Sequence, residues 1–308
     1  MGNPESKGQG SVSTVMGRSA ARWRAGILLT LPSFLFVFAF LVYPIANLVQ
    51  VSFRDYSPLR SSLSPFVGLK NYTWMLHSDT VWHSLGVTLA FTVLSVLVEL
   101  VIGLLIAVLL SRLVLEVKSA WARFFSKAAN GIFILPFAAP GIVAAVAWKM
   151  LLHPQFSPIN AVLGAQIAWF TDFPLLSVVV ADAWKTMPLI LFLALSALLS
   201  IDNSQFEAAR IDGARAWQEF VYLTLPSILP VLAVTCAFRA VDAFTKVFDV
   251  VLGTTGGGPG NDTQVFPLLI WQTGFTNLHF GEAASLAIFA IVISALLGWL
   301  LMLFRRVR

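Results

Sequence analysis

Six long apolar runs divide the chain, and each is long enough to cross a membrane as a helix. A spanning helix needs about 20 mostly apolar residues. The runs lie at residues 25–51, 85–111, 131–151, 174–200, 227–250 and 283–304. The third run contains Pro136, Pro140 and Gly141, so we expect a kink or a late start there. The pattern predicts an all-α, polytopic membrane protein with six transmembrane helices.

The composition excludes a soluble globular protein. Of the 308 residues, 58% are hydrophobic and only 11% are charged, and the mean hydropathy is +0.83. A soluble domain carries about 25% charged residues. The net charge of +5 is interpreted as a sign of membrane topology, because cytoplasmic loops collect Lys and Arg. It does not indicate nucleic-acid binding, because the sequence shows no clustered basic and aromatic face. Cys236 is the single cysteine, and no histidine has metal-ligand spacing, so we expect no disulfide framework and no metal site.

The first residues differ from the rest of the chain. Residues 1–24 are rich in glycine, serine and charge, which predicts a disordered cytoplasmic tail. The run that follows is longer than the 7–15 residues or so of a signal-peptide core, which favours an uncleaved helix. The expected organisation is therefore a tail at 1–24 and a transmembrane domain at 25–308, with a cytoplasmic loop at 201–226.

Basic residues gather on one side of the predicted helices. The tail, two connections and the C-terminus hold Lys7, Arg18, Arg22, Arg24, Arg112, Lys118, Arg123, Lys127, Arg210, Arg215, Arg305, Arg306 and Arg308. The opposite side holds Arg54, Arg60 and Lys70. Since cytoplasmic loops collect Lys and Arg, both termini and the 201–226 loop are predicted to be cytoplasmic.

The loop between the fourth and fifth runs has a pattern of its own. Residues 207–226 read EAARIDGARAWQEFVYLTLP, which predicts a short amphipathic helix, a turn at Gly213 and a second short helix. Asn203 or Ser204 is the expected N-cap, and Ser204 and Glu207 have capping-box spacing. Pro226 and Pro230 are expected to restart the chain as a membrane segment.

This loop resembles the coupling motif of permease subunits of bacterial binding-protein-dependent ABC importers. The match is made by Glu207, Ala208, Ala209, Gly213, Leu223, Leu225 and Pro226, with Leu223 where isoleucine is usual. The resemblance implies a type I, maltose-transporter-like fold. It also implies that the loop, with Asp212 beside its turn, docks into a cleft on an ATPase subunit.

A second resemblance, to the carbohydrate-uptake branch of these permeases, covers most of the chain after the tail. It rests on Tyr43-Pro44, Phe53, Gly68-Leu69-x-Asn71-Tyr72, Trp184-Lys185-x-x-Pro188, Phe238, Arg239, Asp242, Phe244, Phe248, Asp249, Leu252, Thr254, Gly256-Gly257-Gly258-Pro259 and Thr263. It implies half of a translocation pathway for a sugar or sugar-like solute. The implied partners are a second homologous permease, an ATPase dimer and an extracytoplasmic solute-binding lipoprotein, in a bacterial inner membrane.

The chain itself is expected to be non-catalytic. Residues 256–260 are rich in glycine but lack the Lys-Ser or Lys-Thr of a phosphate-binding loop, and we find no such loop elsewhere. ATP and Mg are therefore expected on the partner ATPase, with no cofactor on this chain. The loop with Thr254, Gly256, Gly257, Gly258 and Pro259 lies on the outer side. We interpret it as a shaped loop that faces the binding protein, and the alternative is a simple turn.

Charged residues inside the apolar runs are the candidate solute pathway. Arg239, Asp242, Lys246 and Asp249 are spaced 3, 4 and 3 apart, which would place them on one face of a helix. Each unpaired charge at the bilayer centre would cost about 2.5–3.5 kcal/mol. These residues are therefore expected either to pair with one another or to contact solute.

Two further features belong to this set. Asp182 and Lys185 form a second pair at i, i+3, and the alternative role for Lys185 with Trp184 is an interfacial anchor. Glu99 stands alone and needs a partner on another helix; a structural hydrogen bond is favoured over a proton relay. Trp184 and Phe244 are the aromatic side chains expected beside a sugar.

Two alternatives remain open from sequence. An ion- or proton-coupled secondary transporter would use Glu99 and the charged stripe as a relay, but such proteins often show internal repeats, which we do not detect. An ABC permease for a non-sugar solute is the other alternative. Glycerol phosphate, a disaccharide or a longer oligosaccharide would each suit the sugar interpretation.

Overall fold

The computed structural model describes residues 29–59, 64–116 and 131–303. Within these ranges the chain is helical apart from loops and one isolated antiparallel bridge between Arg54 and Phe66. After the first helix (Leu29–Ser52), which includes η2 (Phe38–Val42) and α2 (Tyr43–Ser52), the elements are α3 (Lys70–His77), α4 (Asp79–Glu116), a helix at Gly131–Ala138, α6 (Gly141–Leu151), α7 (Pro158–Leu163), α8 (Trp169–Asp172), α9 (Pro174–Leu199), α10 (Asn203–Ile211), α11 (Ala216–Gln218), η3 (Glu219–Thr224), α12 (Leu225–Lys246), α13 (Phe248–Gly253), α14 (Phe266–Trp271), η4 (Gln272–Thr276) and α15 (Phe280–Leu303). The all-α prediction is confirmed.

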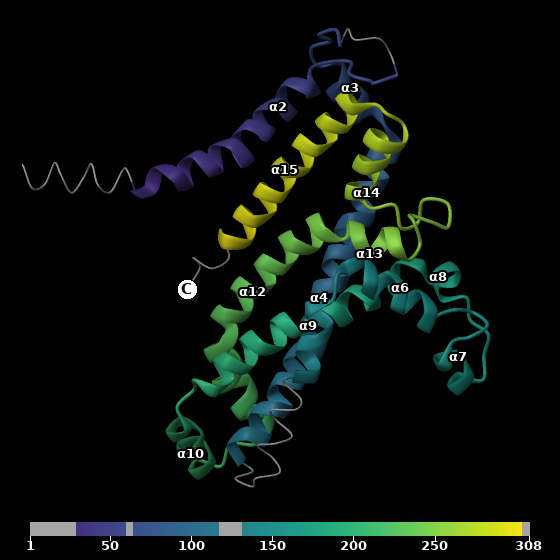
Figure 1. Ribbon diagram of the computed structural model, residues 1–308. Helices are drawn as coiled ribbons and strands as arrows, with labels where there is room; N and C mark the ends of the chain where they lie inside the picture. The colour runs from purple at the N-terminus through teal and green to yellow at the C-terminus, as the bar shows by residue number, and fades with distance from the viewer. Residues whose placement is uncertain (1–28, 60–63, 117–130, 304–308) are drawn as a thin grey trace, which may run out of the picture.

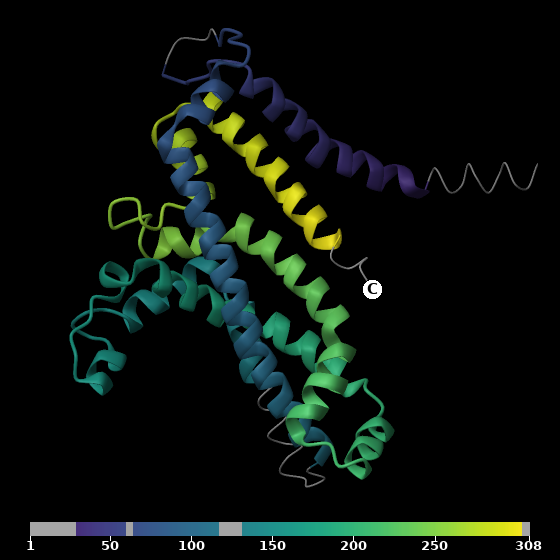
Figure 2. The same cartoon turned by 180° about the vertical axis from the view of Figure 1, so that it is seen from behind.

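The long helix α4 is the axis of the fold. Its 38 residues span about 57 Å at 1.5 Å per residue. Helix α3 lies at one end of α4 and α10 lies at the other (Figures 1 and 2). Helices α9 and α12 pack against α4 between these ends. The loop that contains α10 is therefore separated from the α3 end by the full length of the bundle.

Two apolar clusters hold α4, α9 and α12 together. One contains Ile190, Leu191, Leu198 and Ile228 on the side nearer α10. The other includes Phe91, Val178 and Ala243 toward the opposite side. Glu99 of α4, Asp182 of α9 and Arg239 of α12 lie in the chain between these two sets. Because both neighbours are apolar, polar groups at this level must satisfy one another.

The first helix has few contacts inside the chain. None of the most hydrophobic window of Leu29–Ser52 is buried, and α2 runs outward from the α3 end with α15 as its neighbour (Figure 1). Its C-terminal end is fixed by Asn71, whose Nδ2 donates to the carbonyl oxygens of Ser52 at 2.8 Å and Arg54 at 3.0 Å. The Tyr72 hydroxyl lies 2.8 Å from Ser52 Oγ. The Asn-Tyr pair noted in the sequence thus anchors this helix.

The third apolar run bends sharply, as its two prolines and Gly141 predict. The helix Gly131–Ala138 and α6 form an angle of 106°. By length and composition the described residues contain five helices that could cross a membrane, or six if this bent pair is one span. The break places the N-terminus of α6 beside α13.

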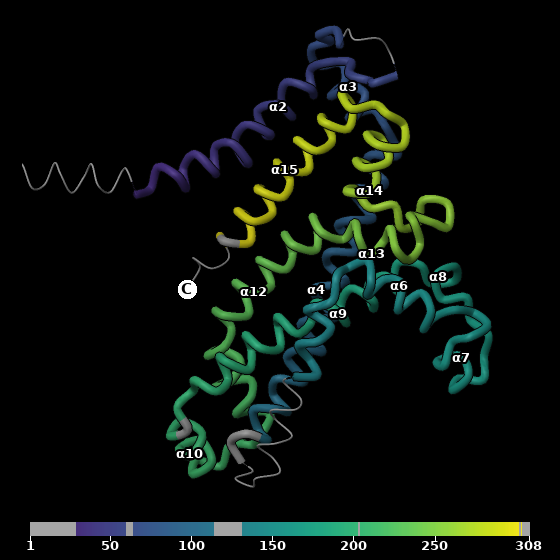
Figure 3. Tube along the Cα trace, viewed as in Figure 1, coloured from purple at the N-terminus to yellow at the C-terminus, as the bar shows by residue number. Residues whose placement is uncertain are grey.

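The fifth span differs from the prediction. It does not begin at residue 227 after a restart at Pro226 and Pro230 but runs without a break from Ala216 to Lys246. Pro226 sits in the first turn of α12, where its missing N–H is tolerated, and Pro230 lies inside the helix. The trace can be followed in Figure 3. The tail at 1–24 and most of the basic residues behind the predicted orientation lie outside the described residues.

Candidate functional site

The loop after α9 folds as two short helices around a glycine turn. Gly213 has φ +82°, a left-handed conformation that glycine adopts without strain, and a side chain there would meet open space. The predicted turn is confirmed. Arg210 Nε lies 3.1 Å from Glu219 Oε1 and ties α10 to η3 across it. A shallow hollow of about 350 Å³ opens here, lined by Ala209, Asp212, Gly213, Ala214, Gln218, Glu219, Tyr222 and Leu223.

The predicted cap of α10 is wrong by one or two positions. The N-cap is Asp202, whose carboxylate accepts from the backbone N–H of Ser204 at 3.0 Å, so Asn203 and Ser204 lie inside the helix. That hydrogen bond lowers the pKa of Asp202 below its ordinary value. Glu207 lies mid-helix and is not a capping-box partner. With Ala208 and Ala209 it belongs to α10, whereas Leu225 and Pro226 begin α12.

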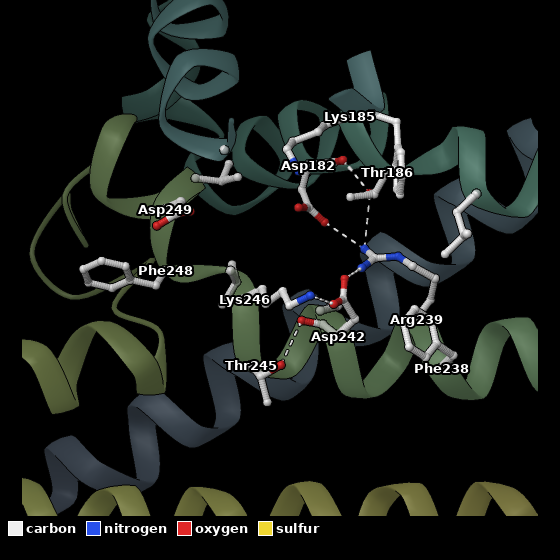
Figure 4. Close-up of a pocket in the computed structure, with 16 residues that line it drawn as sticks. Asp182, Lys185, Thr186, Phe238, Arg239, Asp242, Thr245, Lys246, Phe248 and Asp249 are labelled. Carbon is white, nitrogen blue, oxygen red and sulfur yellow. Dashed lines mark hydrogen bonds and ion pairs between the residues drawn. The ribbon is translucent and has the colours of Figure 1, made fainter. Parts of the chain in front are cut away.

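Arg239 on α12 is the centre of a buried ionic cluster. Its Nε and Nη2 donate to the two oxygens of Glu99 on α4, at 2.7 and 2.6 Å. Nη2 also lies 3.2 Å from Asp182 on α9, and Nη1 donates to Asp242. We call Arg239, Glu99, Asp182, Asp242, Ser95 and Thr186 the Arg239 cluster. Figure 4 shows Asp182, Asp242 and Thr186 converging on the Arg239 guanidinium.

Two hydroxyl groups complete the cluster. Ser95 Oγ lies 2.9 Å from Glu99 Oε1 and 2.7 Å from Asp182 Oδ2, so its single proton is shared between two carboxylates. Thr186 Oγ1 lies 2.8 Å from Glu99 Oε1 and accepts from Arg239. The side chains of Arg239 and Glu99 are 2% and 0% exposed. Since an unpaired charge here would cost several kcal/mol, this cluster ties α4, α9 and α12 to one another.

The single charged stripe predicted for the fifth helix is only partly correct. Arg239, Asp242 and Lys246 do form a ladder, with Lys246 Nζ 2.7 Å from Asp242 Oδ1. Asp249 does not belong to it, because α12 ends at Lys246 and Asp249 lies on α13 (Figure 4). Asp182 makes its ion pair with Arg239 rather than with Lys185. The partner that Glu99 was predicted to need on another helix is Arg239.

A cavity of about 560 Å³ opens beside the cluster. It is lined by Phe137, Gly141, Asp182, Lys185, Thr186, Leu189, Phe238, Arg239, Asp242, Ala243, Thr245, Lys246, Val247, Phe248, Asp249 and Val250. Charged side chains from α9, α12 and α13 thus face a space large enough for a small solute. Three aromatic rings line it as well, from the helix at 131–138 and from α12 and α13.

The aromatic residues expected beside a solute lie elsewhere. Phe244 is 1% exposed and packs in an apolar cluster with Met75, Leu85 and Phe266, so it belongs to the core. Trp184 packs edge-to-face on Trp148 with ring centroids 6.0 Å apart and does not line the cavity. Phe238 and Phe248 line it instead. Sequence alone could not separate them from Phe244, because all three are aromatic residues in one apolar run.

The glycine-rich loop after α13 has a fixed shape. Gly256, Gly257 and Gly260 all have positive φ, and the Gly258–Pro259 bond is cis. Thr263 Oγ1 donates to the Gly258 carbonyl at 2.7 Å. Thr254 is buried, with its hydroxyl bonded to Val250, so it supports the loop from within and is not available to face a partner.

Three further residues of the site were not identified from the sequence. Ser95 and Thr186 stand four residues from Glu99 and Asp182, a helical spacing that marks them as same-face neighbours. Gly141 packs against Asp249, which no pattern in the sequence links to it. Within residues 29–59, 64–116 and 131–303, no three His, Cys, Asp or Glu side chains are placed to hold a metal ion.

Comparison with known proteins agrees with this architecture. Residues 99–307 match the family model described as the binding-protein-dependent transport system inner membrane component. The trehalose/maltose transport system permease protein MalF of Thermococcus litoralis is 33% identical over 281 residues, covering 88% of this chain and 90% of that protein. The trehalose transport system permease protein SugA of Mycobacterium tuberculosis is 30% identical and covers 92% of this chain and 91% of its own length.

A solved structure supports the fold. A chain of a bacterial alginate ABC transporter, in complex with a periplasmic protein that holds an alginate pentasaccharide, has a TM-score of 0.77. It is 21% identical and covers 94% of this chain and 96% of that chain. This chain is a multi-pass membrane protein, and it belongs to the family of binding-protein-dependent transport system inner membrane components.

Proposed function

We propose that this chain is the permease subunit of an ATP-driven importer and forms half of the pathway for a sugar or sugar-like solute. The observation that favours this most is the continuous helix Ala216–Lys246. It joins the hollow around Gly213 to the cavity that Asp242 and Lys246 line. A secondary transporter needs no such link, and its proposed relay residue Glu99 is already paired with Arg239.

The partners follow from the same features. A homologous permease would supply the other half of the pathway, and the exposed first helix, Leu29–Ser52, offers an apolar surface to it or to lipid. An ATPase dimer would bind the α10 loop through Glu207, Ala208, Ala209, Asp212 and Gly213. ATP and Mg would be bound there and not by this chain. An extracytoplasmic binding protein would contact the loop at Gly256, Gly257, Gly258 and Pro259.

The sugar assignment is supported by relatives named for trehalose and maltose. Candidate pathway residues are those that face the cavity from α9, α12 and α13: Asp182, Lys185, Arg239, Asp242, Lys246 and Asp249. Sugars present hydroxyl groups and apolar ring faces, which suit charged and polar side chains beside Phe238 and Phe248. The membrane would be the bacterial inner membrane, with both termini in the cytoplasm.

The decisive experiment compares glycine turns in two separate loops, one after α10 and one after α7. Gly213 and Gly164 both have positive φ and open space at the Cβ position, so Gly213→Asp and Gly164→Asp introduce similar backbone strain. We expect Gly213→Asp to abolish co-purification of the ATPase and solute uptake, and Gly164→Asp to retain both. Glu207→Lys should behave as Gly213→Asp does. Normal uptake by both loop variants would refute the coupling role.

Orientation has its own test. A reporter that is active only outside the cytoplasm should be active when fused after Gly164 or Gly258 and silent when fused after Lys118 or Gly213. Activity after Gly213 would overturn the orientation and, with it, the contact to a cytoplasmic ATPase.

A further inference from the structure

The cavity of about 560 Å³ has few cationic groups available to a solute. The Arg239 guanidinium is 2% exposed and is engaged by three carboxylates. A phosphate or carboxylate is usually bound by arginine through two parallel hydrogen bonds. Arg239 makes that fork to Glu99, so it has none to offer a solute.

The second cation is also engaged. Lys246 is 74% exposed, but its Nζ lies 2.7 Å from Asp242 Oδ1. Asp242 in turn accepts from Arg239 and so bridges the two cations. An anionic solute that approached Lys246 would meet the Asp242 carboxylate beside it. Among the described residues that line the cavity, Lys185 is the one cation for which the structure gives no ion pair.

A fourth positive group is the N-terminal end of α6, where backbone N–H groups point outward and the helix dipole favours negative charge. Asp249 lies against this end. A methyl group built on Gly141, the first residue of α6, would fall 2.8 Å from Asp249 Cβ and 3.1 Å from its Oδ2. Asp249 therefore places a negative charge beside the end of α6 that would otherwise attract an anion.

At neutral pH the side chains in and beside the cavity carry a net negative charge. Arg239, Lys185 and Lys246 face Asp182, Asp242, Asp249 and the Glu99 that pairs with Arg239, which leaves a net charge of −1. Asp249 is exposed, and no ion pair is formed by it within the described ranges, so its carboxylate is free to accept hydrogen bonds from hydroxyl groups. Figure 4 shows it apart from the Arg239–Asp242 contact.

We propose that this cavity selects an uncharged, polyhydroxylated solute and rejects one that carries a phosphate, sulfonate or carboxylate, and that Asp249 is the residue that sets this selection. The inference rests on the proposed function, because it assigns the solute class to the same pathway. The similar proteins do not fix the charge of the solute. They include a permease named for trehalose and maltose, and a solved transporter for the acidic polysaccharide alginate.

The test measures the access of charged and uncharged probes to the cavity, without a transport step. In full-length protein in membranes, Cys236 is replaced by alanine and a reporter cysteine is placed at Thr245, which lines the cavity, or at Gln155, which is exposed in the loop between α6 and α7 and does not line it. Each reporter is labelled with two methanethiosulfonate reagents, one bearing glucose and one bearing a sulfonate. The ratio of the two labelling rates reports the local charge.

We expect the sulfonate reagent to be disfavoured at position 245 relative to position 155. Asp249→Asn should raise its rate at 245 by about 2.5-fold, the effect of one unit charge about 8 Å away in water. The matched control, Asp262→Asn, removes an exposed carboxylate outside the cavity and should leave the ratio unchanged.

Two results would overturn the proposal. One is a sulfonate reagent that reacts at 245 as readily, relative to the glucose reagent, as it does at 155. The other is a ratio at 245 that Asp249→Asn does not change. Neither result bears on ATPase docking, which the comparison of Gly213→Asp with Gly164→Asp tests separately, so failure of this inference can be told from failure of the proposed function.

Discussion

Removing Glu99 and removing Arg239 leave the Arg239 cluster in different states. Arg239→Gln leaves the carboxylates of Glu99, Asp182 and Asp242 with Lys246 as their remaining contacting cation. The Glu99 side chain is fully buried, and an unpaired buried charge costs about 3–5 kcal/mol. Glu99→Gln instead leaves Arg239 paired with two carboxylates.

The charge count predicts the size of the difference. With Lys246 included, the cluster carries a net charge of −1, which Glu99→Gln takes to zero and Arg239→Gln takes to −2. Glu99→Gln still weakens two charge-assisted hydrogen bonds, so we expect a cost of about 1–2 kcal/mol. Arg239→Gln should cost about 2–3 kcal/mol more than that, a factor of roughly 30–150 in the unfolding equilibrium.

The assay is the free energy of unfolding in mixed micelles, measured by SDS titration of the wild type, both single variants and the double variant. In the double variant two amides face each other, so its loss should be smaller than the sum of the single losses by at least about 1 kcal/mol. If Glu99→Gln destabilised the protein as much as Arg239→Gln, or if the two losses simply added, the charge argument would be refuted.

Three further predictions concern single positions. Gly141→Leu should abolish uptake without loss of membrane insertion, because the new side chain would meet Asp249. Gly86→Ala should transport normally, because open space surrounds that position. Equal uptake by the two variants would contradict the close packing of Gly141 on Asp249. Asp202→Ala should speed hydrogen exchange in α10 at pH 7 and Asp202→Asn should not. In the wild type, the protection of α10 amides, measured relative to their unstructured exchange rate at the same pH, should fall only as pH drops through the lowered pKa of Asp202, and a loss of protection near neutral pH would exclude this cap. Asn71→Ala leaves two carbonyls without their donor and should increase the motion of a spin label on α2; an unchanged label would show that other contacts hold the helix.

The parts of the fold that sequence predicted best are those with a local physical signature. Apolar run length identified the spans, two prolines marked the bend before α6, and Gly213 marked a left-handed turn. The N-cap of α10 was missed because Asp202, Asn203 and Ser204 are consecutive and all can cap; only the hydrogen bond from Ser204 selects the first.

The parts that sequence did not resolve depend on packing between distant segments. The apolar, charged run continues past Lys246, so nothing in its periodicity shows that Asp249 belongs to another helix. Glu99 could be recognised as needing a partner, but 140 residues separate it from Arg239. Phe244 and Phe238 lie in the same helix, and their different surroundings follow from where α4, α14 and α15 pack.

The unbroken helix from Ala216 to Lys246 also has a mechanical consequence. The 22 residues of α12 make an arm about 33 Å long beyond the π-helical segment η3. A tilt of about 10° at η3 would carry Lys246 and its side of the cavity through about 6 Å, roughly the width of a sugar ring. The loop around Gly213 would then be the short end of a lever, which turns a small push into a displacement large enough to open or close a passage.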